Sequence, residues 1–146
     1  MINYQKILDK NLLNVLKDIL KNIRDKGLSN NNHLYITFST NHKNIELPNW
    51  IRKKYPNEMT IVIQYEYYDL IINKNSFNIT LSFDNIKTRL KIGFDAVISF
   101  ADPTANFALI LKKNKIQKEL KKNLQKNVTE TNNIIDFSDY KKNYFK

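Results

Sequence analysis

The sequence holds few residues able to carry out catalysis, and their spacing does not suit it. The two histidines, His33 and His42, are nine positions apart and lack a carboxylate or second ligand at metal-site spacing. Glu66 and Asp69 are three positions apart in a segment of β-strand character, so their carboxylates would point to opposite faces. Two carboxylates on opposite faces make a poor acid–base pair. We therefore expect no catalytic residues and no metal site.

Other sequence signatures of enzymes are missing as well. The chain has no cysteine, which excludes disulfides and thiolate-bound metals. Gly27 and Gly93 are the only glycines, so no glycine-rich phosphate loop is present. No serine-nucleophile or His-Glu-x-x-His motif occurs, and Asp84 and Asp95 suit turns on either side of a strand. These observations favour a binding protein without cofactors.

Aromatic residues offer one possible binding surface. Tyr65, Tyr67 and Tyr68 precede a basic segment at residues 88–91, and such a combination would stack single-stranded RNA. The same aromatic side chains would equally form the core of a small β protein, because aromatics dominate core burial. Both interpretations stay open at this point. The phenylalanines that belong to the same group are Phe77, Phe83, Phe100 and Phe107.

The 146-residue chain begins with a predicted amphipathic helix over residues 3–26. Gly27 is the expected stop, since glycine readily adopts the left-handed conformation that ends helices. The apolar face is wider than one contact needs. We expect one side to cover a sheet and the other to meet a second subunit, through Leu8, Leu12, Val15, Leu16 and Ile19.

The rest of the body has the two-residue period of half-buried strands. Strands are expected at residues 33–40, 77–83, 88–92 and 105–111, and residues 59–73 are long enough to bend or to form two strands. Residues 41–57 are expected to be irregular, and residues 94–100 to be a short apolar connector. The pattern predicts an α+β, mostly β protein, with one helix on an antiparallel sandwich or small barrel of five or six strands.

Beyond Leu111 the chain becomes polar and rich in lysine. Ten lysines and four acidic residues follow, so about +6 of the net charge of +10 lies there. We expect a domain at residues 1–111, a polar basic linker at residues 112–133 and an apolar docking segment at residues 134–146. The basic charge allows a nucleic-acid or acidic-protein partner, although an excess of Asn and Lys throughout is also typical of compositional drift.

Several separated segments resemble the alphaproteobacterial branch of the SspB family, whose members deliver tagged proteins to the ClpXP protease. They occur in order over residues 4–111: NHLYITF at 32–38, ELP at 46–48, YPNEMTIVIQ at 55–64, DL at 69–70, FNITLSF at 77–83 and ADPTANF at 101–107. Residues 134–142, IIDFSDYKK, are more loosely similar to the ClpX-docking segment of the family. The basic linker differs from the acidic linker of familiar relatives.

The resemblance implies an SspB-like fold, in which a dimerising N-terminal helix packs on a small β-sandwich related to Sm-like barrels and a flexible tail follows. It implies an adaptor that binds ssrA degradation tags as extended peptides and docks the N-terminal domain of ClpX. The expected tag-binding residues are Gln64, Leu81, Ser82, Phe83, Asn85 and Arg89. The expected ClpX-docking residues are Ile134, Ile135, Phe137, Tyr140, Lys141 and Lys142.

The expected location is the cytoplasm. The N-terminus has no apolar block of the signal-peptide kind, and no apolar stretch approaches the roughly 20 residues that span a bilayer. The alternatives to an adaptor are an RNA-binding Sm-like module that uses the basic surface and a purely structural or assembly protein. Steep salt dependence of binding would mark the first of these, and failure to bind any tag peptide would mark the second.

Overall fold

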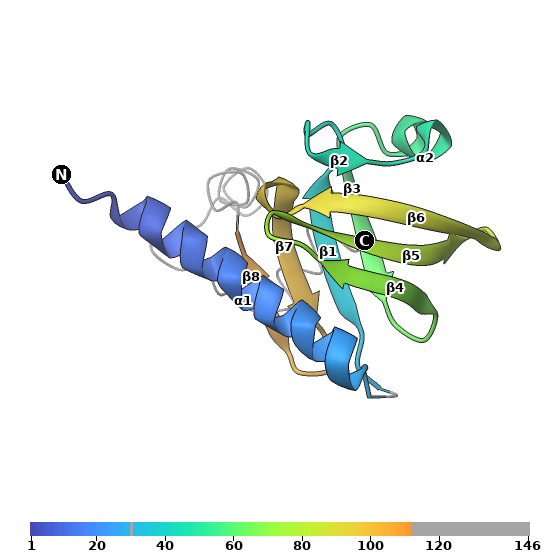
Figure 1. The fold of residues 1–146 in the computed structure, drawn as a ribbon, viewed down its shortest axis with the longest axis horizontal. Helices are drawn as coiled ribbons and strands as arrows, with labels where there is room; N and C mark the ends of the chain where they lie inside the picture. The colour runs from blue at the N-terminus through green and yellow to red at the C-terminus, as the bar shows by residue number, and fades with distance from the viewer. Residues whose placement is uncertain (30, 112–146) are drawn as a thin grey trace, which may run out of the picture.

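The chain folds into one long helix and two antiparallel four-stranded sheets, seen in a computed structural model that describes residues 1–29 and 31–111 (Figure 1). The predicted α+β, mostly β architecture with an N-terminal helix is confirmed. In chain order the elements are α1 (Tyr4–Lys26), β1 (Leu34–Ser39), β2 (Ile45–Glu46), α2 (Asn49–Lys54), β3 (Glu58–Ile63), β4 (Tyr67–Ile72), β5 (Ser76–Phe83), β6 (Ile86–Gly93), η1 (Phe94–Ala96), β7 (Val97–Asp102) and β8 (Phe107–Ile110).

Helix α1 begins and ends where local chemistry requires. The Asn3 side chain accepts a hydrogen bond from the Lys6 backbone N–H at 3.0 Å, a cap that stabilises a helix by about 1 kcal/mol. Gly27 has φ of 73°, and its N–H donates to the Ile23 carbonyl at 2.8 Å. These bonds define the 23-residue helix that the sequence predicts.

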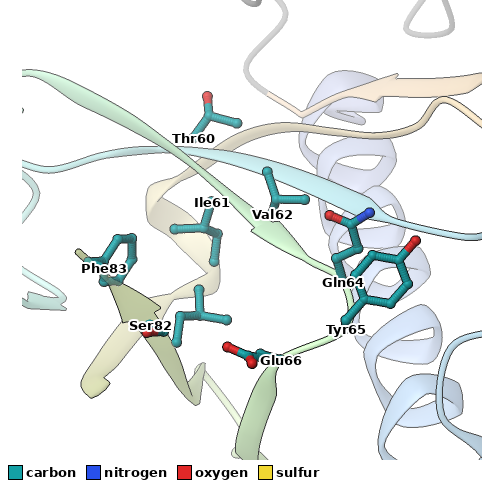
Figure 2. Close-up of a pocket in the computed structure, with 9 residues that line it drawn as sticks. Thr60, Ile61, Val62, Gln64, Tyr65, Glu66, Ser82 and Phe83 are labelled. Atoms are coloured by element: carbon teal, nitrogen blue, oxygen red, sulfur yellow. The ribbon is translucent and has the colours of Figure 1, made fainter. Parts of the chain in front are cut away.

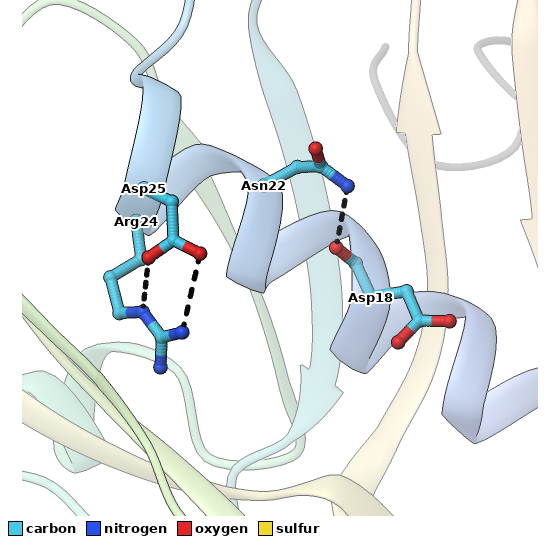
Figure 3. Close-up of polar contacts among 4 residues, drawn as sticks. All are labelled: Asp18, Asn22, Arg24 and Asp25. Atoms are coloured by element: carbon cyan, nitrogen blue, oxygen red, sulfur yellow. Dashed lines mark hydrogen bonds and ion pairs between the residues drawn. The ribbon is translucent and has the colours of Figure 1, made fainter.

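Polar side chains on the solvent side of α1 bond to neighbouring residues of the same helix (Figure 3). Asn22 Nδ2 donates to the Asp18 carbonyl at 3.1 Å, and Arg24 Nε donates to Asp25 Oδ1 at 2.9 Å. The hydrogen bond from Arg24 holds the pKa of the Asp25 carboxyl below its usual value. Because this pair is exposed, it contributes little to folding. The buried side of the helix, carrying Leu16, Leu20 and Ile23, supplies most of its stability instead.

The first sheet, sheet A, has the strand order β3-β1-β7-β8, and the second, sheet B, has the order β2-β6-β5-β4. All pairings within the two sheets are antiparallel. The core lies between the sheets and is closed by α1. Phe38, Phe77 and Phe100 are fully buried in it, together with Leu16 and Leu20 of the helix. Each such side chain contributes about 2 kcal/mol on burial.

Two parts of the strand prediction were wrong. Residues 94–100 are not a connector, because they form η1 and most of β7, a strand inside sheet A. Every residue from Val97 to Ala101 is buried, so this strand has no alternation of apolar and polar side chains to reveal it. Residues 41–57 are not wholly irregular either, since they contain β2 and α2. The described residues therefore hold eight strands rather than five or six.

Gly93 holds the end of β6 against the turn between β1 and β2. Its N–H donates to the Asn44 carbonyl at 2.8 Å, and Asn44 Nδ2 donates to Asp95 Oδ2 at 2.9 Å. A Cβ at position 93 would lie 2.7 Å from Asn44 Cβ and 2.9 Å from its carbonyl oxygen. Glycine is required here by the close approach of the two backbones.

Gly93→Ala should lower the free energy of unfolding by about 1–3 kcal/mol in urea titrations, the usual effect of overpacking. Gly27→Ala is the matched comparison. The nearest atom to its new Cβ is Tyr67 Oη at 3.9 Å, so only the strain of positive φ applies. The Gly93 variant should be the less stable of the two. A Gly93→Ala protein as stable as the wild type would show that this contact adjusts freely.

Candidate functional site

A groove of about 470 Å³ lies where sheet A and sheet B meet at the strand β3 (Figure 2). One wall is β3, the loop after it forms one end, and the last residues of β5 form the other wall. The residues that line it are Thr60, Ile61, Val62, Gln64, Tyr65, Glu66, Leu81, Ser82 and Phe83.

The groove follows the edge of β3. Ile61 belongs to the buried face of the strand, whereas Thr60 and Val62 alternate with it on the other face, yet all three line the groove. Within residues 1–29 and 31–111, β1 is the strand paired with β3, and β3 ends the strand order of its sheet. An edge strand directs part of its backbone N–H and C=O groups away from its neighbour. The groove therefore offers a row of main-chain donors and acceptors.

The wall opposite β3 is apolar and continues into exposed aromatic surface. Leu81 is buried, and Phe83 is half-buried against the core. Trp50 of α2 meets the Phe83 ring edge-on, with the ring centroids 6.4 Å apart. Trp50 and Ile86 remain 41% and 57% exposed. Exposed apolar groups beside a groove are suited to holding side chains of a ligand.

The end of the groove near β4 is polar. Gln64 Nε2 lies 3.3 Å from His33 Nδ1, which ties the end of β3 to the start of β1. Tyr65 is 73% exposed, and Glu66 is the charged member of the lining. A Gln side chain has both a donor and an acceptor, so Gln64 is able to bond a peptide backbone. In Figure 2 Gln64 and Tyr65 lie together at this end.

The structure brings four of the six predicted tag-binding residues together. Gln64, Leu81, Ser82 and Phe83 all line the groove, whereas Asn85 and Arg89 are absent from the lining. Asn85 lies in the turn between β5 and β6 with φ of 66°. Arg89 is exposed between the buried residues Thr88 and Leu90, so it points to the outer face of sheet B.

Sequence patterns did not identify the rest of the lining, which comprises Thr60, Ile61, Val62, Tyr65 and Glu66. The alternation of apolar and polar residues at 58–63 shows a strand, but it does not show that this strand is at an edge. Edge position depends on pairing with β1, which is distant in the sequence. The exposure of Tyr65 and Trp50 was not predicted either, because aromatic side chains are usually expected to be largely buried.

The residues predicted to form the dimer interface have different environments along α1. Leu16 is fully buried in the core of its own chain, and Leu12 and Ile19 are half-buried against that core. Leu8 and Val15 are each 39% exposed. The helix therefore has an apolar strip outside the core. Further exposed apolar residues beside this strip are Tyr4 and Ile7.

The predicted linker and ClpX-docking segment lie outside the described residues, and so do Ile134, Ile135, Phe137, Tyr140, Lys141 and Lys142. In the part of the chain that the structure describes, no group of three or more His, Cys, Asp or Glu side chains is placed to hold a metal ion. None of the described helices is long and apolar enough to cross a membrane.

A comparison with protein families identifies this chain's relatives. The family model described as SspB, stringent starvation protein B, matches residues 6–143 and so covers nearly the whole chain. No curated protein matches the chain significantly. The match includes most of α1, both sheets and the groove along β3.

Proposed function

This chain belongs to the SspB family, and we propose that it binds ssrA-type degradation tags in the groove along β3 and tethers the tagged proteins to ClpX. The SspB family is a family of protease adaptors and not a known enzyme family. An adaptor requires no catalytic residues, but it requires a substrate contact, a protease contact and a connection between them. We further propose that it works in the cytoplasm, where ClpXP and its tagged substrates would be.

The observation that carries the proposal is the open edge of β3 beside an apolar wall. An extended peptide adds to such an edge through main-chain hydrogen bonds, and side-chain pockets then read alternate residues of the peptide. Val62 and Thr60 lie along the edge, and Leu81 and Phe83 face it across the groove. This arrangement suits a tag of small and polar residues because the backbone supplies most of the contact.

The side chains at the ends of the groove would set the register of the tag. Gln64 offers a donor and an acceptor at the polar end, where His33 already holds it in place. At the other end Phe83 and Trp50 present ring edges to an apolar residue of the tag. One polar and one apolar anchor on opposite ends distinguish the two directions of an extended peptide.

We propose that residues 1–111 form the tag-binding and dimerisation domain, residues 112–133 the linker, and residues 134–146 the ClpX-docking segment. In this scheme Ile134, Ile135, Phe137 and Tyr140 supply apolar contacts, and Lys141 and Lys142 follow them as steering charges. A flexible tether raises the effective substrate concentration at the protease to about millimolar. A dimer through α1 would present two such tails, so that weak docking gains avidity.

Gln64→Ala should weaken binding of the host's own ssrA tag peptide about fivefold, the loss expected for one hydrogen bond of about 1 kcal/mol. Fluorescence anisotropy of a labelled tag peptide with the full chain measures this. Gln5→Ala on α1 makes the same chemical change far along the chain from the groove residues and should leave the affinity unchanged. Equal affinities for both variants and wild type would remove Gln64 from the site. Absence of any binding by the wild type would refute the adaptor proposal.

Removal of residues 134–146 should leave tag binding intact and abolish the acceleration of tagged-reporter degradation by ClpXP at low adaptor concentration. A deletion of equal length in the linker, residues 117–129, should retain most of the acceleration because the docking segment is kept. Persistent acceleration by the truncated protein would contradict tethering. Loss of tag binding on truncation would instead place the tail in the groove.

Val15→Glu should weaken a homodimer at least tenfold in sedimentation experiments, because a charge replaces an exposed apolar side chain of the proposed interface. The neighbouring change Asn14→Glu introduces the same charge at an exposed polar position and should have little effect. Both sites are exposed, so both variants should fold. A wild-type protein that is monomeric at micromolar concentration would rule out this interface.

A further inference from the structure

The outer face of sheet B carries a row of cations. Lys87, Arg89 and Lys91 alternate along β6 with the buried residues Thr88 and Leu90, so all three side chains point away from the core. All three are exposed. Alternate residues of a strand are roughly 7 Å apart. This repeat is comparable with the distance between successive phosphates of an extended single strand of nucleic acid.

A row of hydrogen-bonding side chains runs beside the cations on β5. Asn78, Thr80 and Ser82 are the register partners of Lys91, Arg89 and Lys87 respectively. Asn78 Oδ1 is buried and has no hydrogen-bond partner. Such an acceptor has lost its water without a replacement, which is unfavourable. A ligand that draws the Asn78 amide toward an N–H donor would satisfy it.

An aromatic ring lies on the far side of this polar row. Tyr68 of β4 is the register partner of Thr80 and is 40% exposed. Lys87 Nζ sits over its ring, 4.3 Å from the centroid. Ile71, three residues further along β4, lies on the same face because the strand register shifts between the two residues, and it is 44% exposed. The outer face therefore combines cations, hydrogen-bonding groups and an exposed ring (Figure 1 shows β6, β5 and β4 side by side).

The charges on this face are only partly balanced. Glu46 of β2 is the register partner of Lys91, and its carboxylate lies 4.0 Å from Lys91 Nζ. Within residues 1–29 and 31–111, neither Lys87 nor Arg89 forms an ion pair with an acidic group, and Lys87 meets the Tyr68 ring instead. The two cations nearest the ring are therefore the ones available to an anion.

We propose that the outer face of sheet B binds single-stranded nucleic acid, a function separate from tag binding. Lys87 and Arg89 would contact successive phosphates, and one base would stack on Tyr68 after Lys87 swings from the ring to a phosphate. The base edge would meet Asn78 and Thr80. A basic strip beside an exposed ring is the arrangement by which proteins bind single strands without strong sequence preference.

An acidic peptide would satisfy the cations, and its backbone N–H groups would suit Asn78. Its carboxylates, however, have no flat ring to stack on Tyr68. Nucleobases supply both a donor and a ring, since each has a π face and all but thymine and uracil carry an exocyclic amino group. The exposed Tyr68 ring beside the two cations thus favours nucleic acid over an acidic protein segment.

The test is fluorescence anisotropy of the full chain with labelled 12-mers of oligo(rA) and oligo(dA) over a range of salt concentrations. Lys87→Gln with Arg89→Gln should weaken binding about tenfold. It should also reduce the slope of log affinity against log salt by about 1.4, which is the contribution of two phosphate contacts on a single strand. Tyr68→Leu should weaken it about fivefold or more through lost stacking. Tighter binding of one oligomer would show whether the ribose hydroxyl contributes.

The matched control is Lys43→Gln with Lys53→Gln, two exposed lysines in the β1–β2 turn and in α2. It removes the same charge and should change affinity less than threefold. Equal losses in both pairs would overturn the proposal, because binding would then follow net charge, including that of the lysine-rich C-terminal region. A 12-residue polyglutamate that binds as tightly, with no effect of Tyr68→Leu, would overturn it in favour of an acidic protein.

Photo-crosslinking provides a second measurement that needs no variant. Oligo(dA) carrying a single bromodeoxyuridine should crosslink to the peptide containing Tyr68 in the wild-type protein. Crosslinks confined to other peptides, or failure of both oligomers to bind at low salt, would contradict the site.

Discussion

The free edge of β3 is the constraint on which the rest of the account depends. Within the described residues this strand is paired with β1 on one side, and the far side opens into the groove. A backbone edge without a partner strand is normally hidden or blunted, because it invites pairing with any extended chain. Here the Leu81–Phe83 end of β5 lies across the groove from this edge, and the Trp50 ring packs against Phe83. In the proposed function, this edge accepts one extended peptide rather than another whole sheet.

Side chains of the same helix or strand face the core on one side and solvent on the other. Side chains of α1 such as Leu16 and Leu20 close the core, which leaves the strip at Leu8 and Val15 exposed. In sheet B the same alternation turns Ile79 and Leu90 inward and Thr80 and Arg89 outward. The strands of sheet B therefore contribute to the core, to one wall of the groove along β3 and to the basic outer face. The groove and the outer face meet at Ser82, which lines the groove and also ends the polar row of β5.

Sequence patterns predicted the elements whose signals are local. α1 has continuous helical spacing and a glycine stop, and β5 alternates cleanly, so both were found with nearly correct bounds. β7 was missed because burial of both its faces removes the alternation. Gln64 and the Leu81–Phe83 segment were identified through a family resemblance, whereas Val62 and Tyr65 were not, because the groove exists only once distant strands are paired. Arg89 was assigned to the groove, but strand alternation places it on the outer face.

Hydrogen–deuterium exchange of the full chain, with and without the host's ssrA tag peptide, distinguishes addition of the tag to the β3 edge from binding elsewhere on the protein. If the tag adds to the edge of β3, the backbone amides among residues 60–63 that point away from β1 gain hydrogen-bond partners and should exchange more slowly when the tag is bound. The buried strand β7 should show little change, because its amides already lie within sheet A. Protection that appears only on the outer face of sheet B, at residues 87–91, or binding of the tag without any slowing at residues 60–63, would contradict edge addition.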